Sequence, residues 1–226
     1  MKNTLLAVLL FVIIGNLQAQ QRRDLKEVDL EAMLDETQFA SDNEDYVDLI
    51  WWIPMEYWKA VYAQDPSIPQ DEADEMISIL KNYDIVAAVR GKIGYFGGVT
   101  FLDEASIREQ LNLKYDDVTY DPLDNDDIDA DLKSFIDIMR PMFSNMMGDM
   151  GENLYFVVYQ DGASNSAIID PYGDKNLTLT LNDFSDSLQF PLSSLLQPKK
   201  CPKDGALFNG KWLFCPHHGD ALKVQI

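Results

Sequence analysis

The residues best suited to chemistry lie near the end of the chain, in a short phrase that occurs twice. Cys-Pro-x-x-Gly begins at Cys201 and again at Cys215, and these are the only cysteines of the chain. In each phrase proline fixes φ and supplies no N–H, while glycine accepts the positive φ that closes the turn. Backbone N–H groups are then directed at the sulfur. Two such turns facing each other predict a clamp closed by a metal ion or by a disulfide.

The doubled phrase resembles the zinc ribbon, a family of small β-hairpin modules whose two knuckles usually have the sequence Cys-Pro-x-Cys-Gly. The resemblance covers residues 201–219. It departs from the family pattern at the second ligand of each knuckle, where this chain has Asp204 and His218. Thiolate, imidazole and carboxylate groups all bind zinc in closed tetrahedral sites. The resemblance therefore implies a zinc site made of Cys201, Asp204, Cys215 and His218.

A disulfide between Cys201 and Cys215 is the competing interpretation. Sulfurs close enough to share a metal ion can bond with little movement, and an exported protein meets oxidising conditions. Closing a loop of about 15 residues stabilises the fold by about 3 kcal/mol in the chain-entropy model. The residues leave zinc and the disulfide both open, and the expected compartment favours the disulfide.

That compartment is predicted from the N-terminus, which has the pattern of an export signal. Lys2 forms a short basic region, an apolar run extends from Leu5 to Ile14, and small or polar residues end at Ala19. The run is about ten residues long, whereas a helix that spans a bilayer needs about 20. No cysteine follows it to carry a lipid anchor. We therefore predict a signal peptide over residues 1–19 and a soluble periplasmic or secreted protein without membrane insertion.

The charge of the chain is strongly acidic but unevenly distributed. The net charge is −20, and residues 1–19 hold one lysine and no acidic residue, so the remainder carries −21. Residues 199–226 hold five lysines and two aspartates, a net charge of +3, so residues 20–198 carry −24. A body of this charge repels nucleic-acid phosphate. We predict no nucleic-acid partner and expect a protein or glycan partner instead.

A run of eight aspartates is a weaker candidate, for calcium. They occupy residues 116–131. The stretch from Asp127 begins like an EF-hand loop, but Leu132 stands where glycine is required and Ile138 where the closing glutamate belongs. A solvated acidic loop is the simpler interpretation, and irregular calcium coordination remains the alternative.

The elements that must position these residues are predicted from periodicity. Helices are expected over residues 55–63, 71–83, 103–113 and 132–147, the last interrupted at Pro141. Strands are expected over residues 46–53, 85–89, 93–101, 153–160, 166–170 and 177–181, with a turn at Gly91-Lys92 and an antiparallel meander formed by the last three. Trp51 and Trp52 must lie on opposite faces of their strand.

These elements predict an α+β protein. An acidic domain over residues 20–198 contains a mixed or antiparallel sheet covered by helices on one side. A linker from Gln197 to Lys200 then leads to a ribbon-like C-terminal hairpin, and we place this module at residues 199–226.

Catalytic signatures are weak in this sequence. His217 and His218 are its only histidines, no serine motif resembles a nucleophile elbow, and no glycine-rich loop follows a nucleotide-binding pattern. We therefore expect a non-catalytic binding or structural interaction protein of the cell envelope. The alternative is a carboxylate-dependent hydrolase, acting for example on glycans, because so acidic a chain offers many carboxylate pairs.

Overall fold

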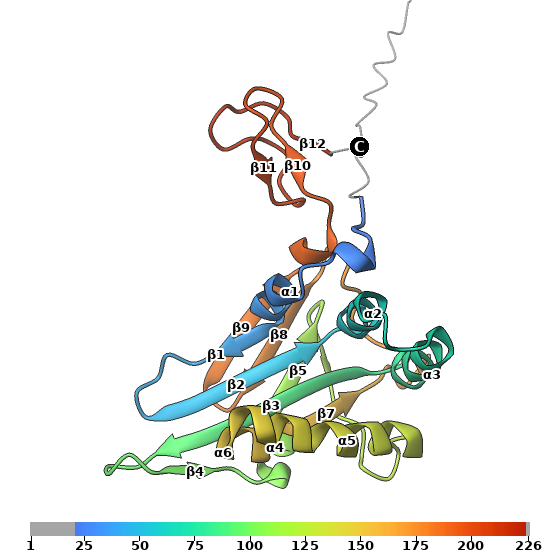
Figure 1. Cartoon of the computed structure of the whole chain (residues 1–226). Helices are drawn as coiled ribbons and strands as arrows, with labels where there is room; N and C mark the ends of the chain where they lie inside the picture. Colours follow the sequence, from blue (N-terminus) through green and yellow to red (C-terminus); the bar gives the residue numbers. More distant parts are fainter. Residues whose placement is uncertain (1–20, 225–226) are drawn as a thin grey trace, which may run out of the picture.

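The fold consists of a layer of helices, a five-stranded central sheet and a four-stranded second sheet, with a small three-stranded ribbon at one end (Figure 1). The structure is a computed structural model, and it describes residues 21–224. The predicted signal peptide at residues 1–19 lies outside the described residues. Within residues 21–224, no helix combines the length and the apolar character needed to cross a membrane.

The central sheet is antiparallel throughout and is organised around one long strand. Its strands are β1 (Gln38–Ala40), β2 (Tyr46–Ile53), β3 (Asp84–Ile93), β4 (Val99–Phe101) and β7 (Tyr155–Tyr159). β2 pairs with one edge of β3 over eight residues, while β7 and β4 share the other edge. Trp51 lies opposite Ala87 and Trp52 opposite Val86. The two tryptophans belong to different core clusters, which confirms that they occupy opposite faces.

The second sheet covers one face of the central sheet. Its strand order is β6 (Val118–Tyr120), β5 (Leu111–Tyr115), β8 (Asn176–Leu181) and β9 (Phe184–Gln189), again antiparallel. Alternate residues of β5 and β8, such as Leu113 and Leu179, are fully buried against Trp52 and its neighbours. The intervening residues are polar, and they are exposed or half-buried. This is expected for an antiparallel sheet with one face exposed to solvent.

Three of the helices cover the other face of the central sheet. The helices in chain order are η1 (Leu25–Glu27), α1 (Leu30–Thr37), α2 (Met55–Gln64), α3 (Gln70–Leu80), α4 (Glu104–Gln110), α5 (Ala130–Met147), α6 (Asp149–Glu152) and η2 (Ser193–Leu195). Trp58 of α2, Leu80 of α3 and Phe135 of α5 pack against the side of the sheet that carries Trp51. The predicted α+β class, with an antiparallel sheet and helices on it, is confirmed.

Several boundaries differ from the sequence-based expectation. Gly91 and Lys92 lie inside β3, and the chain turns at residues 94–98 instead. The helix expected over 103–113 ends at Gln110, and β5 begins at the next residue. The predicted meander is wrong, because β7 pairs with β3 whereas β8 pairs with β5 and β9. Pro141 lies within α5, which continues as one helix to Met147.

The ribbon contains three two-residue strands, β10 (Lys199–Lys200), β11 (Leu207–Phe208) and β12 (Lys223–Val224), with β10 in the middle. It joins the body next to the start of the described chain, where the backbone N–H of Gln197 donates to the Gln21 carbonyl. Lys211 also reaches the body and donates to the Gln189 carbonyl at 2.8 Å. The C-terminal strands thus form a small separate sheet attached at one end of the body (Figure 1).

A buried carboxyl group ties three segments of the body together. Asp84, at the start of β3, is only 4% exposed, and it accepts hydrogen bonds from Trp52 Nε1 and from the backbone N–H groups of Ile168 and Ile169. Burial raises the pKa of Asp84 to about 6, and these hydrogen bonds oppose the shift without cancelling it.

This pKa gives the stability a pH dependence of known sign. The folded state holds the proton of Asp84 more tightly than the unfolded chain does. Protonated Asp84 therefore contributes fully to the free energy of unfolding below pH 4, and this contribution is lost as the pH rises to 6. The shift corresponds to roughly 2–3 kcal/mol. Urea unfolding of the native protein and of Asp84→Asn from pH 4 to pH 7 measures this effect. The difference between their free energies of unfolding should decrease by roughly 2–3 kcal/mol over this range. A difference independent of pH would contradict the assignment.

Candidate metal centre

The two Cys-Pro-x-x-Gly turns adopt the same backbone geometry. In the first, Cys201 N–H donates to the Ala206 carbonyl and Gly205 N–H to the Cys201 carbonyl. The second repeats this pattern, with Cys215 N–H donating to Asp220 and Gly219 N–H to Cys215. Gly205 and Gly219 have φ values of 77° and 72°. The repeated phrase thus produces two matching knuckles, each closed by a glycine in the left-handed region.

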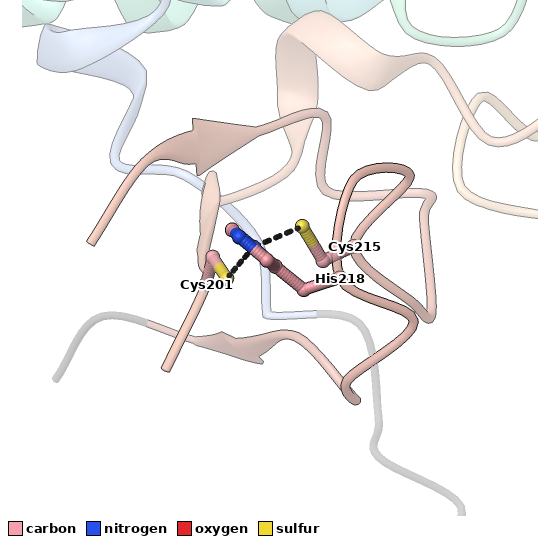
Figure 2. Close-up of side chains that lie close together, drawn as sticks. All are labelled: Cys201, Cys215 and His218. Carbon is pink, nitrogen blue, oxygen red and sulfur yellow. Dashed lines mark hydrogen bonds between the residues drawn. The ribbon is translucent and has the colours of Figure 1, made fainter. Parts of the chain in front are cut away.

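The knuckles face each other and bring three ligand atoms together. The sulfurs of Cys201 and Cys215 lie 3.4 and 3.5 Å from Nδ1 of His218, whose ring is placed between them (Figure 2). These three atoms lie within 4.8 Å of one another, the only such group of three among residues 21–224. Both cysteines are free thiols in this structure and almost fully buried. The Cys2His cluster can hold a metal ion such as zinc.

The distances match the edges of a zinc coordination tetrahedron. Zinc binds sulfur at about 2.3 Å and imidazole nitrogen at about 2.0–2.1 Å, which places the two ligand atoms about 3.5 Å apart at a tetrahedral angle. The two sulfur–nitrogen separations, 3.4 and 3.5 Å, agree with this value. The same separation occurs on both sides of His218 Nδ1, so both sulfur–nitrogen edges are compatible with one shared zinc ion.

Asp204 lies beside the cluster but outside the group of three. Its Oδ1 accepts the backbone N–H of Ala206, which leaves Oδ2 turned toward His218, 3.6 Å from Nδ1. A nitrogen and an oxygen that share a zinc ion would be about 3.3 Å apart. Of the four residues named from the sequence, the structure therefore brings together Cys201, Cys215 and His218, with Asp204 adjacent to them.

The electrostatics of the site follow from its burial and its neighbours. Burial raises the pKa of the Cys201 thiol, and the nearby Asp204 and Cys215 add to this increase. Backbone N–H groups of Asp204 and Lys203 point at the sulfur and lower the pKa of the Cys201 thiol. The hydrogen bond from Ala206 N–H, followed by that from the Cys201 thiol, lowers the pKa of Asp204. A cation bound between the sulfurs would reverse the Cys201 shift by stabilising the thiolate.

The aspartate run proposed for calcium forms no comparable centre. Asp116 and Asp117 occupy the turn between β5 and β6 and pair with Lys175 and Lys114 at 2.8 and 2.7 Å. Asp129 caps α5. These aspartates are dispersed over a turn, a loop and a helix start, so no three of the eight converge among the described residues.

An exposed apolar surface on the ribbon was not foreseen from the sequence. Trp212, Leu213 and Phe214 follow one another between the knuckles, and each is between 46% and 61% exposed; Leu207 of β11 is 56% exposed. Trp212 stacks on Phe208. The sequence feature that could have predicted this surface is the run of three consecutive large apolar residues. A module of 28 residues is too small to bury them all.

Comparison with models of protein families, with curated proteins and with solved structures gave no match to this chain.

Gly219→Ala should loosen the second knuckle. A Cβ at Gly219 meets nothing within 4 Å, so the cost comes from the φ of 72° alone and amounts to about 1–2 kcal/mol. The backbone amide of Cys215, which donates to the Asp220 carbonyl in this knuckle, should then exchange hydrogen about 5- to 30-fold faster. Gly162→Ala is the matched control, because it is also uncrowded and its φ is not positive. Equal exchange rates in the two variants would contradict a strained knuckle.

Proposed function

We propose that this chain is an exported, non-catalytic binding protein of the cell envelope whose C-terminal ribbon is folded around a structural zinc ion. The single observation that supports the zinc assignment most strongly is the position of His218 Nδ1, 3.4 and 3.5 Å from two buried sulfurs. Cys201, Cys215 and His218 would be three ligands, and Asp204 Oδ2 would complete a closed tetrahedral site.

The need for a clamp follows from the size of the ribbon. Among its described residues, the core consists of Cys201, Cys215 and Leu222, with Phe208 partly buried against them. So small a core cannot offset the conformational entropy of ordering the module. Zinc binding supplies about 10–16 kcal/mol in small zinc-dependent modules, and it would stabilise both knuckles at once.

The binding role rests on the exposed surface that the ribbon presents. Contiguous exposed apolar residues on a protein surface commonly mark interaction sites. Here Trp212, Leu213 and Phe214 extend from a module that carries a net charge of +3, on a chain of −20. An acidic, partly apolar protein segment or an acidic glycan has the complementary chemistry. The ribbon would then be the part of the molecule that contacts the partner.

No observation among residues 21–224 favours the carboxylate-dependent hydrolase. Asp48 and Asp84 are the carboxyl groups whose pKa is raised, in each case primarily by burial. Asp48 lies beside the buried Arg90, with 3.5 Å between Oδ1 and Nε, and Asp84 is hydrogen-bonded to Trp52. Both side chains are buried in the protein interior, so neither is placed to act on a substrate.

The zinc assignment predicts one zinc ion per chain in protein purified without chelator, measured by elemental analysis together with intact mass. Zinc should protect both thiols from an alkylating reagent, and removing it with a chelator should make them reactive. A metal-free protein whose mass is lower by two hydrogen atoms would establish the Cys201–Cys215 disulfide instead. Two reactive thiols without any metal would contradict both arrangements.

The role of Asp204 is tested by changing its ligand type. Asp204→Ala should weaken zinc binding about 10- to 100-fold in competition with a chromophoric chelator. Asp204→Cys restores the Cys-Pro-x-Cys-Gly knuckle and should tighten binding about tenfold or more, because thiolate is a softer ligand. Asp220→Ala is the control, since it also removes one acidic group of the ribbon and breaks an ion pair with Lys203 that is not part of the group of three ligand atoms. An affinity that Asp204→Ala leaves equal to that of the control would exclude Asp204 as a ligand.

A further inference from the structure

The three strands of the ribbon place exposed side chains in a row on one face. Lys200 of β10 lies directly opposite Leu207 of β11 and directly opposite Lys223 of β12. Residues directly opposite each other in antiparallel strands share a face of the sheet. All three residues are exposed. They therefore form a row across the outer face of the ribbon.

Phe214 extends this row by one position. It forms a bridge with Ala221, which precedes Lys223 by two residues and so points to the same side of an extended chain. Burial agrees with this alternation, because Leu222, between Ala221 and Lys223, is buried in the ribbon core, whereas Phe214 is 61% exposed. The outer face thus has two lysines at its centre and a large apolar residue on each side. We call these four residues the lysine face: Leu207, Lys200, Lys223 and Phe214.

The two central lysines are not neutralised by the ribbon itself. Neither forms an ion pair with any residue of 21–224, and the ribbon has two acidic residues, Asp204 and Asp220. Asp220 pairs with Lys203 at 3.2 Å, and Asp204 directs Oδ2 toward His218. Like charges directly opposite each other on a sheet repel. An anionic group bound between the two ammonium groups would remove this repulsion.

The Leu207 end of the lysine face borders a cavity between the ribbon and the body. The cavity measures about 310 Å³, and Ala32 and Pro198 contribute apolar surface to it. Its charged residues are Arg23 and Asp29, one of each sign, so the lining has no net charge. This volume is sufficient for one large apolar side chain next to Leu207.

The dimensions of the face define the partner. Neighbouring strands are about 4.8 Å apart, so the row from Leu207 to Phe214 covers about 14–16 Å. In an extended chain, residues i, i+2 and i+4 share one side and together span about 13–14 Å. A carboxylate at the middle position would therefore reach both lysines. Apolar side chains two positions away on either side would reach Leu207 and Phe214.

We infer that the lysine face binds an extended segment of another protein in which an aspartate or glutamate stands between two large apolar residues, each two positions away. The inference rests on the binding role proposed above and names the partner of that surface. The carboxylate contacts Lys200 and Lys223, and the apolar residues cover Leu207 and Phe214. An acidic glycan supplies the charge but lacks large aliphatic side chains for the Leu207 end, so the face fits a protein segment better.

The test is an NMR titration of the isotope-labelled full chain with two synthetic peptides whose ends are blocked. The matched peptide is Ser-Leu-Ser-Glu-Ser-Phe-Ser. The permuted peptide, Ser-Leu-Glu-Ser-Ser-Phe-Ser, has the same composition, but its glutamate points to the opposite side of an extended chain. The matched peptide should shift the amide signals of Lys200, Leu207 and Lys223, and it should bind at least about tenfold more tightly than the permuted one.

Variants of the chain test which residues carry this binding. Lys200→Gln with Lys223→Gln should weaken binding of the matched peptide about tenfold. This variant removes a repulsion between like charges, so the ribbon should keep its fold. Lys81→Gln with Lys92→Gln is the control, because it removes two exposed lysines of the body and changes the net charge equally. Leu207→Ser should weaken binding about fivefold, since less apolar surface is buried.

Equal affinity for the two peptides, signal shifts confined to other residues, or no binding of either peptide would overturn the inference. Tighter binding of polygalacturonate or of phosphatidylglycerol vesicles at the same face would also overturn it, because an acidic glycan or a lipid surface would then be the occupant.

Zinc content, measured on the same samples, separates this inference from the proposed function. A zinc-loaded chain that binds polygalacturonate through Trp212 and not through the lysines would leave the proposed function intact and overturn the inference. A zinc-free chain that binds the matched peptide on the lysine face would support the inference and contradict the zinc assignment.

Discussion

The two central strands of the body bury side chains on both faces, and the rest of the body is arranged to cover them. From Leu49 to Ile53 in β2 and from Ile85 to Val89 in β3, every residue is buried. Adjacent side chains of a strand point to opposite sides, so one covering layer cannot be sufficient. Helices α2, α3 and α5 pack on one face and the β5–β8 sheet on the other. Asp84 joins the register of β2 and β3 to the segment that precedes β8.

The ribbon obeys a different constraint, because it has almost no core of its own. In the proposed arrangement, its stability comes from cross-linking the two knuckles and from a few contacts with the body, such as Lys211 with the Gln189 carbonyl. A metal ion or a disulfide can each provide that cross-link, and each acts on the same two sulfurs. A module stabilised in this way can leave Trp212, Leu213 and Phe214 exposed, since its fold does not depend on burying them.

The molecule therefore presents aromatic side chains to solvent at both ends, and each group has a rigid support. At one end the knuckles hold the Trp212–Phe214 segment, and at the other a hydrogen-bonded glycine turn holds Tyr95 and Phe96. The body between them is strongly acidic, with a net charge of −24 over residues 20–198. This division supports a binding or assembly role more directly than a catalytic one, because the buried carboxyl groups Asp48 and Asp84 serve the core.

The sequence by itself determined the features that depend on local chemistry. The doubled Cys-Pro-x-x-Gly phrase specified two equal turns, and Pro54 ended β2 before a helix. The sequence also placed Trp51 and Trp52 on opposite faces of β2, but it predicted helices on one side of the sheet and did not reveal the second sheet that covers the other side. Tertiary structure decided the features that depend on partners distant in sequence. Leu111, Leu113 and Tyr115 alternate over only five residues, so they form a strand because β8 lies beside them. The convergence of His218 Nδ1 on both sulfurs, with Asp204 set to one side, likewise arose only when the ribbon strands paired, because ligand geometry is fixed by the approach of two turns and not by the spacing within either one.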